Sequence, residues 1–561
     1  GRPSRRMSWQ SPVWNTILYH IGRDARHGGA LMQNRTVLHV TLLAGLCALT
    51  LLPAAAFRGL TGMEFRTALF VREILNNGPS LVPRLDGAPY VDYPPLYFLA
   101  AALSSRLLGS ITPLSLALPS VLAAVGAVIL VYFMTERERP GSGLGAGVAL
   151  ALTPLLFSCA SQGNVDAMLL FFTTLTLAGC RRHVLSGARG AFAAACIGLA
   201  GGALTKGPIG VAVPLFAASL WLLMQGRLRT LASLLLKLGL FLAAFAAICV
   251  SAILLVEGRV HLERLMGAQI FDRVADKANA PRIYYLWVFL GGFAPWSIFA
   301  LGRLFRRGDR ERREFDWFCA SWLFSTFLLL SLASIKHSRY LLPAAPPVAI
   351  LAAFFWQDLR TTGAPSWTPV VTTWIRRVCL TLLAAGVLVL AIAPVFLPVA
   401  SPALSWCLPA ACLLPLLIPA LRGKSDGSGA FLLLAWTMAA GFLAFSQFDS
   451  PRMSAKEEAR PFVHSVERAA GGNRIVFYGI GKDADGLKFL YWRTGTAPLS
   501  FIESLPALRG AVDGTQLAIL VLPSRERGEV EKEFGPRLRF LFGGRLGKRR
   551  CTVFNLANGA Q

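Results

Sequence analysis

Residues 36–57 read TVLHVTLLAGLCALTLLPAAAF, an apolar stretch without Asp, Glu, Lys or Arg. A bilayer core requires about 20 apolar residues in a helix, whereas the core of a signal peptide has only about 7–15. The preceding residues 1–35 contain several arginines, among them Arg23, Arg26 and Arg35. We therefore predict a basic cytoplasmic segment over 1–35, followed by an uncleaved first transmembrane helix.

The composition extends this interpretation to most of the chain. The 561 residues are 54% hydrophobic and only 15% charged, whereas an average soluble domain is about one-quarter charged. Even so, 56 Lys and Arg against 30 Asp and Glu give a net charge of +26, and the mean hydropathy is +0.53. Disordered chains are poor in apolar residues, so disorder is excluded. Nucleic-acid binding would explain the charge but not the apolar mass, so we expect no nucleic-acid partner. A polytopic membrane protein explains both properties.

Twelve further apolar runs bring the predicted number of transmembrane helices to about 13. They cover 113–134, 144–159, 165–180, 191–204, 209–224, 234–256, 283–301, 317–334, 340–356, 378–396, 404–421 and 429–446. The run at 94–108 is shorter and opens with two prolines, which is more typical of an interfacial segment. With 13 spans, most Lys and Arg outside the C-terminal part fall on the cytoplasmic side, as the positive-inside rule requires.

This topology divides the chain into three predicted parts. Residues 1–35 are cytoplasmic and residues 36–448 form the transmembrane domain, in which 58–110 is a first outer loop carrying two juxtamembrane helices. Residues 449–561 form a small extracytoplasmic α/β domain. There we expect a helix from a capping box at Ser454 to about Gly471. Strands are expected at 474–480, 487–492 and 516–522, and helices at 503–510 and 524–534.

Ionisable residues gather where the predicted spans meet the outer face. Three carboxylates and four cations fall there, namely Glu64, Asp92, Asp166, Arg66, Lys206, Lys336 and Arg339. Charged residues at a bilayer face indicate a functional site. Cations suit a phosphate group, and a carboxylate suits a general base.

Each of these residues also has an ordinary structural interpretation. Glu64 and Arg66 would face water on an interfacial helix, and Asp92 would belong to a turn. Asp166 would cap a helix, and Lys206 would mark a helix end and reach the headgroups. Lys336 and Arg339 would be interfacial anchors beside Tyr340.

Four motifs resemble one family of membrane enzymes. The run GMEFRTALFVREILNNGPSLVPRLDGAPYVDYPPLYFLAAAL at 62–103 is similar to the first outer loop of the bacterial aminoarabinose transferase and protein O-mannosyltransferase families. NVDAMLLFF, ALTKGPIGVAVP and KHSRYLLPAAPP follow in the family's order. The resemblance covers about residues 36–356. It implies a GT-C fold: a multispan glycosyltransferase of the bacterial inner membrane that takes a sugar from a polyprenyl-phosphate carrier outside the cytoplasm.

The sequence departs from the family at two positions. Met63 stands where the family usually has the aspartate favoured as catalytic residue, so we assign the catalytic role to Glu64 and Asp166. Tyr93 stands where the aminoarabinose enzymes usually have lysine. The remaining assignments are Arg66, Lys206, Lys336 and Arg339 at the donor phosphate, and Asp92, Tyr93 and Tyr340 at other substrate groups.

The expected reaction moves the sugar from undecaprenyl phosphate to a lipid such as lipid A, with inversion at the anomeric carbon. A protein acceptor is the first alternative. We expect membrane lipids as partners and no required cofactor, with a divalent cation beside the carboxylates as the alternative. Two other classes stay open: a non-catalytic lipid-binding protein and a transporter, which would show inverted repeats and midplane polar residues.

Overall fold

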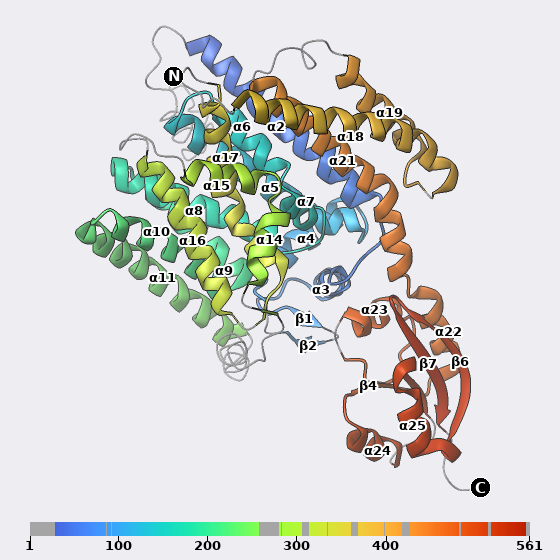
Figure 1. Cartoon of the computed structure of the whole chain (residues 1–561). Helices are drawn as coiled ribbons and strands as arrows, with labels where there is room; N and C mark the ends of the chain where they lie inside the picture. The colour runs from blue at the N-terminus through green and yellow to red at the C-terminus, as the bar shows by residue number, and fades with distance from the viewer. Residues whose placement is uncertain are drawn as a thin grey trace, which may run out of the picture.

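The computed structural model describes residues 29–85, 87–90, 93–256, 280–281, 283–305, 313–333, 335–360, 368–397, 399–417, 427–481, 484–513 and 518–556. Asp92, which we predicted in the site, lies outside these residues. The described chain forms a large helical bundle and a smaller domain with a β-sheet, which Figure 1 shows in red.

The bundle contains the predicted apolar runs. Its helices are α2 (Gly29–Ala56), α5 (Pro113–Glu138), α6 (Gly143–Ala151), α7 (Pro154–Ala160), α8 (Asp166–Ser186), α9 (Arg189–Lys206), α10 (Pro208–Met224), α11 (Leu228–Val256), α14 (Tyr284–Gly292), α15 (Trp296–Phe305), α16 (Arg313–Leu332), η2 (Ser338–Ala344), α17 (Ala345–Asp358), α18 (Thr368–Phe396), α19 (Pro402–Leu417) and α21 (Gly427–Glu457). Each of the 13 runs coincides with a helix or a bent pair of helices.

The number of spans is smaller by a stricter criterion. Within the described part of the chain, 7 helices are long and apolar enough to cross a membrane, or up to 9 if each bent pair is one span. The bent pairs are α6 with α7, at 59°, and α14 with α15, at 106°. The polytopic, mainly helical architecture is therefore confirmed, whereas the count of 13 stays a prediction.

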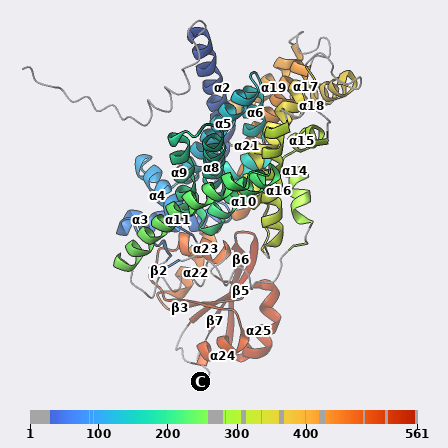
Figure 2. The same cartoon turned by 90° about the vertical axis from the view of Figure 1, so that its left-hand side faces the viewer.

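The first outer loop has the predicted juxtamembrane helices. They are α3 (Glu64–Asn77) and α4 (Leu96–Leu107), with the short strands β1 (Arg84–Leu85) and β2 (Ala88–Pro89) between them. Both views place α3 at the end of the bundle that faces the sheet domain, away from the N-terminal end of α2 (Figures 1 and 2).

Small residues hold α8 and α9 close together. A Cβ added at Gly198 of α9 would lie 2.7 Å from the backbone nitrogen of Thr176, and one at Gly179 of α8 would lie 2.6 Å from the carbonyl oxygen of Ala191. Close backbone approach at small residues is typical of helix packing in membranes. Since the two helices are antiparallel, the start of α8 lies beside the end of α9.

The C-terminal domain is the predicted small α/β unit. It consists of α22 (Arg460–Ala470), β3 (Arg474–Tyr478), α23 (Ala484–Trp492), β4 (Leu499–Ile502), α24 (Leu505–Asp513), β5 (Ala518–Pro523), η3 (Ser524–Glu526), α25 (Arg527–Phe534), η4 (Gly535–Arg537), β6 (Leu538–Leu546) and β7 (Arg549–Leu556). The sheet order is β4-β3-β5-β7-β6, parallel from β4 to β5 and antiparallel through β7 and β6.

Two local predictions in this domain were wrong. The apolar run 487–492 is helix α23 and not a strand, because Leu487 and Leu490 pack towards the first outer loop while Phe489 packs into the sheet core. Such a short run, buried on two sides, has no periodicity that separates strand from helix. Ser454 does not start a helix either: it lies inside α21, and its hydroxyl accepts a hydrogen bond from the backbone N–H of Gly59 at 2.7 Å.

The sheet domain packs directly against the first outer loop. Helix α21 continues past the predicted boundary at 448/449 as far as Glu457. Helix α23 packs on α3, where the Arg72 guanidinium donates to the carbonyls of Leu490 and Tyr491 at 3.1 and 3.0 Å. The first outer loop and the C-terminal domain therefore share one end of the bundle.

Candidate active site

The close packing of α8 and α9 creates a buried charge cluster. Asp166 is the first residue of α8 and Lys206 the last of α9. They form an ion pair, and the side chains of Asp166 and Lys206 are only 1% and 6% exposed. Arg339, from η2, places its Nε 3.5 Å from the second carboxylate oxygen of Asp166. One carboxylate therefore faces two cations.

The Tyr340 ring packs against both cations of this cluster. The Lys206 ammonium lies 4.1 Å from the centre of the Tyr340 ring, and the Arg339 guanidinium carbon lies 5.6 Å from the same centre. A ring face attracts cations, most strongly where water is excluded. Three separate motifs, around Asp166, Lys206 and Arg339, are thus brought together as predicted, and Lys206 is buried rather than extended to the headgroups.

Asp166 does not act as an ordinary helix cap. Helix α8 has no side-chain cap hydrogen bond, and the second carboxylate oxygen of Asp166 is buried without a hydrogen-bond partner among the described residues. This oxygen has Arg339 as an ion-pair partner but makes no hydrogen bond, and a buried polar atom without a hydrogen bond is costly and calls for an explanation. Its position against two cations fits a group that a substrate engages.

Glu64 has a different environment from Asp166. It lies in the first turn of α3, is 2% exposed, and forms a bidentate ion pair with Arg58. The same carboxylate accepts from the backbone N–H groups of Thr61 and Gly163 at 3.0 and 2.7 Å. The catalytic role of Glu64 stays a prediction. Its carboxylate is fully paired and connects the loop before α3 to the loop before α8, as expected of a structural anchor.

Arg66 and Tyr93 stack beside the cluster. The Arg66 guanidinium carbon lies 4.5 Å from the centre of the Tyr93 ring, and Arg66 donates to the Tyr90 hydroxyl at 3.1 Å. The Nε of Arg66 is buried without a partner among the described residues. Burial alone would raise the pKa of the Tyr93 phenol, but Arg66, then Lys206 and Arg339, lower it below the ordinary value. The surroundings of Tyr93 are therefore strongly positive.

Lys336 is oriented differently from the other predicted cations. It is buried, and its ammonium donates to the carbonyl of Ala333 at 2.9 Å, just after the end of α16. A cation at a helix C-terminus offsets the helix dipole. Its predicted contact with the donor phosphate stays a prediction.

A cavity of about 260 Å³ opens above the cluster, between the bundle and the C-terminal domain. Its lining includes the predicted residues Glu64, Arg66 and Arg339, together with Met63. Asn164, the first residue of the NVDAMLLFF motif, also lines the cavity, whereas sequence reasoning missed Gln162, Met453, Glu457 and Lys548. Arg339 connects the two regions, because it lines the cavity and contacts Asp166.

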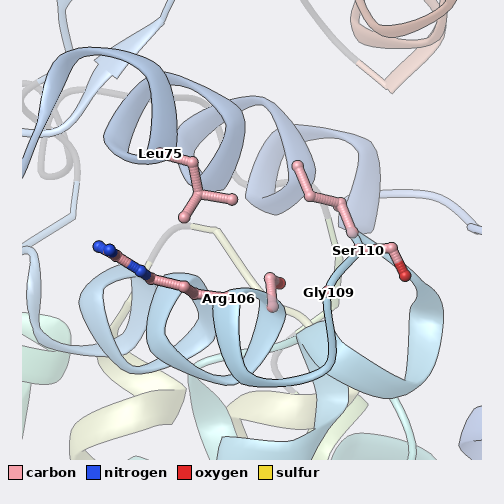
Figure 3. A pocket seen from close by; sticks show the side chains of 6 residues that line it. Leu75, Arg106, Gly109 and Ser110 are labelled. Carbon is pink, nitrogen blue, oxygen red and sulfur yellow. The ribbon is translucent and has the colours of Figure 1, made fainter.

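A second pocket, of about 510 Å³, lies apart from this site (Figure 3). It is lined by Leu75, Ser105, Arg106, Gly109, Ser110 and Ile111, and Leu75 points from α3 towards α4. No predicted site residue lines it. As for metals, the described residues contain no group of three or more His, Cys, Asp or Glu that could hold an ion.

Known proteins with similar sequences are sugar transferases. Residues 92–254 match the family model of dolichyl-phosphate-mannose-protein mannosyltransferase. The undecaprenyl phosphate-alpha-4-amino-4-deoxy-L-arabinose arabinosyl transferases of Edwardsiella ictaluri and Erwinia tasmaniensis are 27% and 26% identical. Both alignments cover 54% of this chain. They cover 55% and 56% of the two relatives, so the chain spans about half the length of these proteins.

Solved structures extend the similarity to nearly the whole chain. ArnT from Cupriavidus metallidurans in the apo state is 18% identical, with a TM-score of 0.67 over 95% of this chain and 100% of that one. The same protein bound to undecaprenyl phosphate is 17% identical, with a TM-score of 0.66 over 93% and 99%. The chain therefore has the GT-C fold, and its resemblance to the aminoarabinose transferase and protein O-mannosyltransferase group is confirmed.

Proposed function

We propose that this chain is a membrane glycosyltransferase that moves a sugar from a polyprenyl-phosphate carrier to a lipid acceptor. The observation that carries the proposal is the convergence of Asp166, Lys206 and Arg339 beneath a cavity at one end of the bundle. The relatives named above are undecaprenyl-phosphate-dependent transferases, and the related ArnT structure contains undecaprenyl phosphate. Both support a carrier of this class.

The chemistry follows from the charges. The bond between the anomeric carbon and the carrier's phosphate oxygen breaks, and the electron pair leaves with the polyprenyl phosphate. Lys206 and Arg339 offset the charge that grows on this leaving group, which is the stabilisation that preorganised cations supply. The acceptor oxygen attacks the opposite face of the anomeric carbon and inverts it. Arg66 lines the cavity, and the Tyr93 ring stacks against its guanidinium group.

Asp166 is the carboxylate best placed to take a proton from a hydroxyl acceptor. In the absence of substrate its charge offsets those of the buried Lys206 and the partly exposed Arg339, which would otherwise repel each other. The phosphodiester of the arriving donor carries one negative charge, competes for the same cations and so loosens them from Asp166; the second negative charge develops only as the bond to the sugar breaks. The carboxylate then becomes available as a base only when the donor is bound. An acceptor that is already ionised would need no base.

The proposed site faces the outside of a bacterial cytoplasmic membrane. The N-terminal end of α2 and the C-terminal domain lie at opposite ends of the bundle. Arg181 lies near the C-terminal end of α8, at the opposite end of that helix from Asp166, in agreement with the positive-inside rule. We therefore place the N-terminus in the cytoplasm and the C-terminal domain outside. No required cofactor is part of the proposal.

Lipid analysis tests the proposed function. Lipids are extracted from cells that lack the gene and from cells that carry the wild-type gene or Arg339→Ala. We expect one glycan-modified lipid that is present only with the wild-type gene. If the lipid profiles are identical in all three strains, the proposed lipid acceptor is wrong.

A protein acceptor is the second candidate. It is favoured by the match of residues 92–254 to the protein mannosyltransferase family. Labelled sugar that appears in the protein fraction and not in the lipid fraction, dependent on Arg339, would support it over the lipid acceptor.

A further inference from the structure

The outer cavity receives one cation from the C-terminal domain. Strands β6 and β7 are joined by the two-residue turn Gly547–Lys548, and Lys548 lines the cavity together with Met63 and Arg66. Gly547 has φ of +65°, a conformation that favours glycine. The tight hairpin therefore fixes the position from which the Lys548 side chain extends.

Lys548 is held there by a carboxylate with two partners. Its ammonium lies 2.8 Å from one oxygen of Glu457, and the Lys488 ammonium lies 2.5 Å from the other. The two lysines differ in burial: the Lys488 side chain is 3% exposed, whereas that of Lys548 is 64% exposed. Lys488 is also held by Asp485 at 3.0 Å.

Because of this difference in burial, Lys548 is the partner that Glu457 can release at the lower cost. When Lys548 leaves Glu457, the carboxylate keeps a buried partner in Lys488, so no isolated buried charge results. Because water reaches the Lys548 side of this ion pair and weakens it, an anion in the cavity can compete for Lys548. Removing Lys488 instead would leave a buried carboxylate with less compensation, which is costly.

We propose that Lys548 is an acceptor-binding residue that recognises a phosphomonoester group in the outer cavity. The inference rests on the proposed function and adds where and how the acceptor binds. A phosphate group that enters the cavity beside the C-terminal domain replaces the Glu457 carboxylate as the partner of Lys548. Arg66 and Arg339 line the same cavity, so an anion there meets cations from three separate elements. In the proposed function the donor phosphate binds at the cluster around Asp166, whereas the ion pair of Lys548 is with Glu457.

The first experiment needs no turnover. The purified full-length protein is treated with an amine-acetylating reagent, and modification of Lys548 is measured by mass spectrometry. Vesicles of phosphatidylcholine with phosphatidic acid, which carries a phosphomonoester, are compared with phosphatidylcholine alone and with inorganic phosphate. Exposed Lys532 of α25 serves as the internal control.

We expect phosphatidic acid to slow acetylation of Lys548 about 3–10-fold and to leave Lys532 unchanged. Protection by inorganic phosphate as well would identify the phosphate group as the ligand, whereas protection by vesicles alone would identify the lipid headgroup. Equal labelling of Lys548 in all conditions would overturn the proposal.

The second experiment separates this inference from the proposed function. Transfer is measured against acceptor concentration for Lys548→Ala, Lys548→Arg and the control Lys532→Ala. We expect Lys548→Ala to raise the acceptor KM about 3–10-fold with kcat and undecaprenyl phosphate binding unchanged, and Lys548→Arg to restore most of it. An unchanged acceptor KM would refute the role of Lys548. If the wild-type protein does not bind undecaprenyl phosphate, the proposed function fails instead, and the labelling result still decides whether Lys548 binds the anion.

Discussion

Replacing Glu64 by glutamine should mainly destabilise the protein. Its carboxylate is 2% exposed and accepts hydrogen bonds from Arg58, Thr61 and Gly163. Glutamine keeps the volume and one acceptor oxygen, but it removes the charge that compensates the Arg58 guanidinium, whose side chain is 6% exposed. Breaking a buried pair by removing one partner costs about 3–5 kcal/mol. We therefore expect Glu64→Gln to lower the free energy of unfolding by ~3 kcal/mol, near the lower end of that range.

The measurement is denaturant unfolding of the full-length protein in detergent, together with transfer activity per folded molecule. Glu73→Gln is the matched control: it lies on the same helix, and its carboxylate accepts a bond from Asn77 in an exposed position. It should change stability by less than about 0.5 kcal/mol. Arg58→Met combined with Glu64→Gln should be less destabilising than the sum of the single changes, because neither charge is then left alone.

The opposite result would assign the residue a different role. If Glu64→Gln unfolds like the wild type but loses most transfer, the anchoring argument is wrong and Glu64 is the base. If the variant is destabilised and its folded fraction transfers sugar at the native rate, Asp166 is the better candidate for the catalytic carboxylate.

Four further predictions concern the cluster, the cavity and the topology. Lys206→Ala and Arg339→Ala should each weaken undecaprenyl phosphate binding by ~1.5–3 kcal/mol, the scale of a charged hydrogen bond; unchanged titration curves would remove both residues from the donor site. Asp166→Asn should reduce transfer to a hydroxyl acceptor by ~10²–10⁴-fold, and an unchanged rate would mean that the acceptor is an ionised group needing no base or that the chain is not a glycosyltransferase of this kind. Met63→Asp should be neutral or activating, and a clear loss of transfer in this variant would contradict that expectation. A reporter fused after Asp449 should be active only outside the cytoplasm, and cytoplasmic activity would contradict the 13-span topology. Burial, then Arg339 and Lys206, lower the pKa of His337. The unfolded state therefore binds the proton more tightly, and stability should fall as the pH drops below about 6.5; His337→Asn should flatten this dependence in unfolding measured from pH 5 to 8.

The helices could be predicted because their signal is local. Length and apolarity of a run, such as 36–57 or 113–134, are sufficient to indicate a membrane helix, and the flanking Arg residues indicate its orientation. Strands β6 and β7 gave no comparable signal, since Arg and Gly interrupt them. They form only because β7 pairs with β5 on one side and β6 on the other.

Part of the site could also be predicted, because some of its residues give a local signal in the sequence. Asp166, Lys206 and Arg339 stand out because each interrupts an apolar region at the end of a predicted span. The partner of Glu64 was not foreseen: Arg58 lies six residues earlier in the chain, and only the loop's path brings the two together. Lys548 and Glu457 belong to the domain that covers the cavity, and their part in it depends on tertiary packing alone.

The geometry of the charge cluster depends on residues that carry no charge. Asp166 and Lys206 meet because α8 and α9 approach closely at Gly179 and Gly198, where a Cβ would lie within 3 Å of the neighbouring backbone. A wider separation would draw apart the start of α8 and the end of α9, and with them the two charges. Arg339 would then have to neutralise Asp166 alone. The charged residues of the motif around Lys206 are therefore not sufficient to form the cluster. The small residues that allow the backbones of α8 and α9 to come into contact are needed as well.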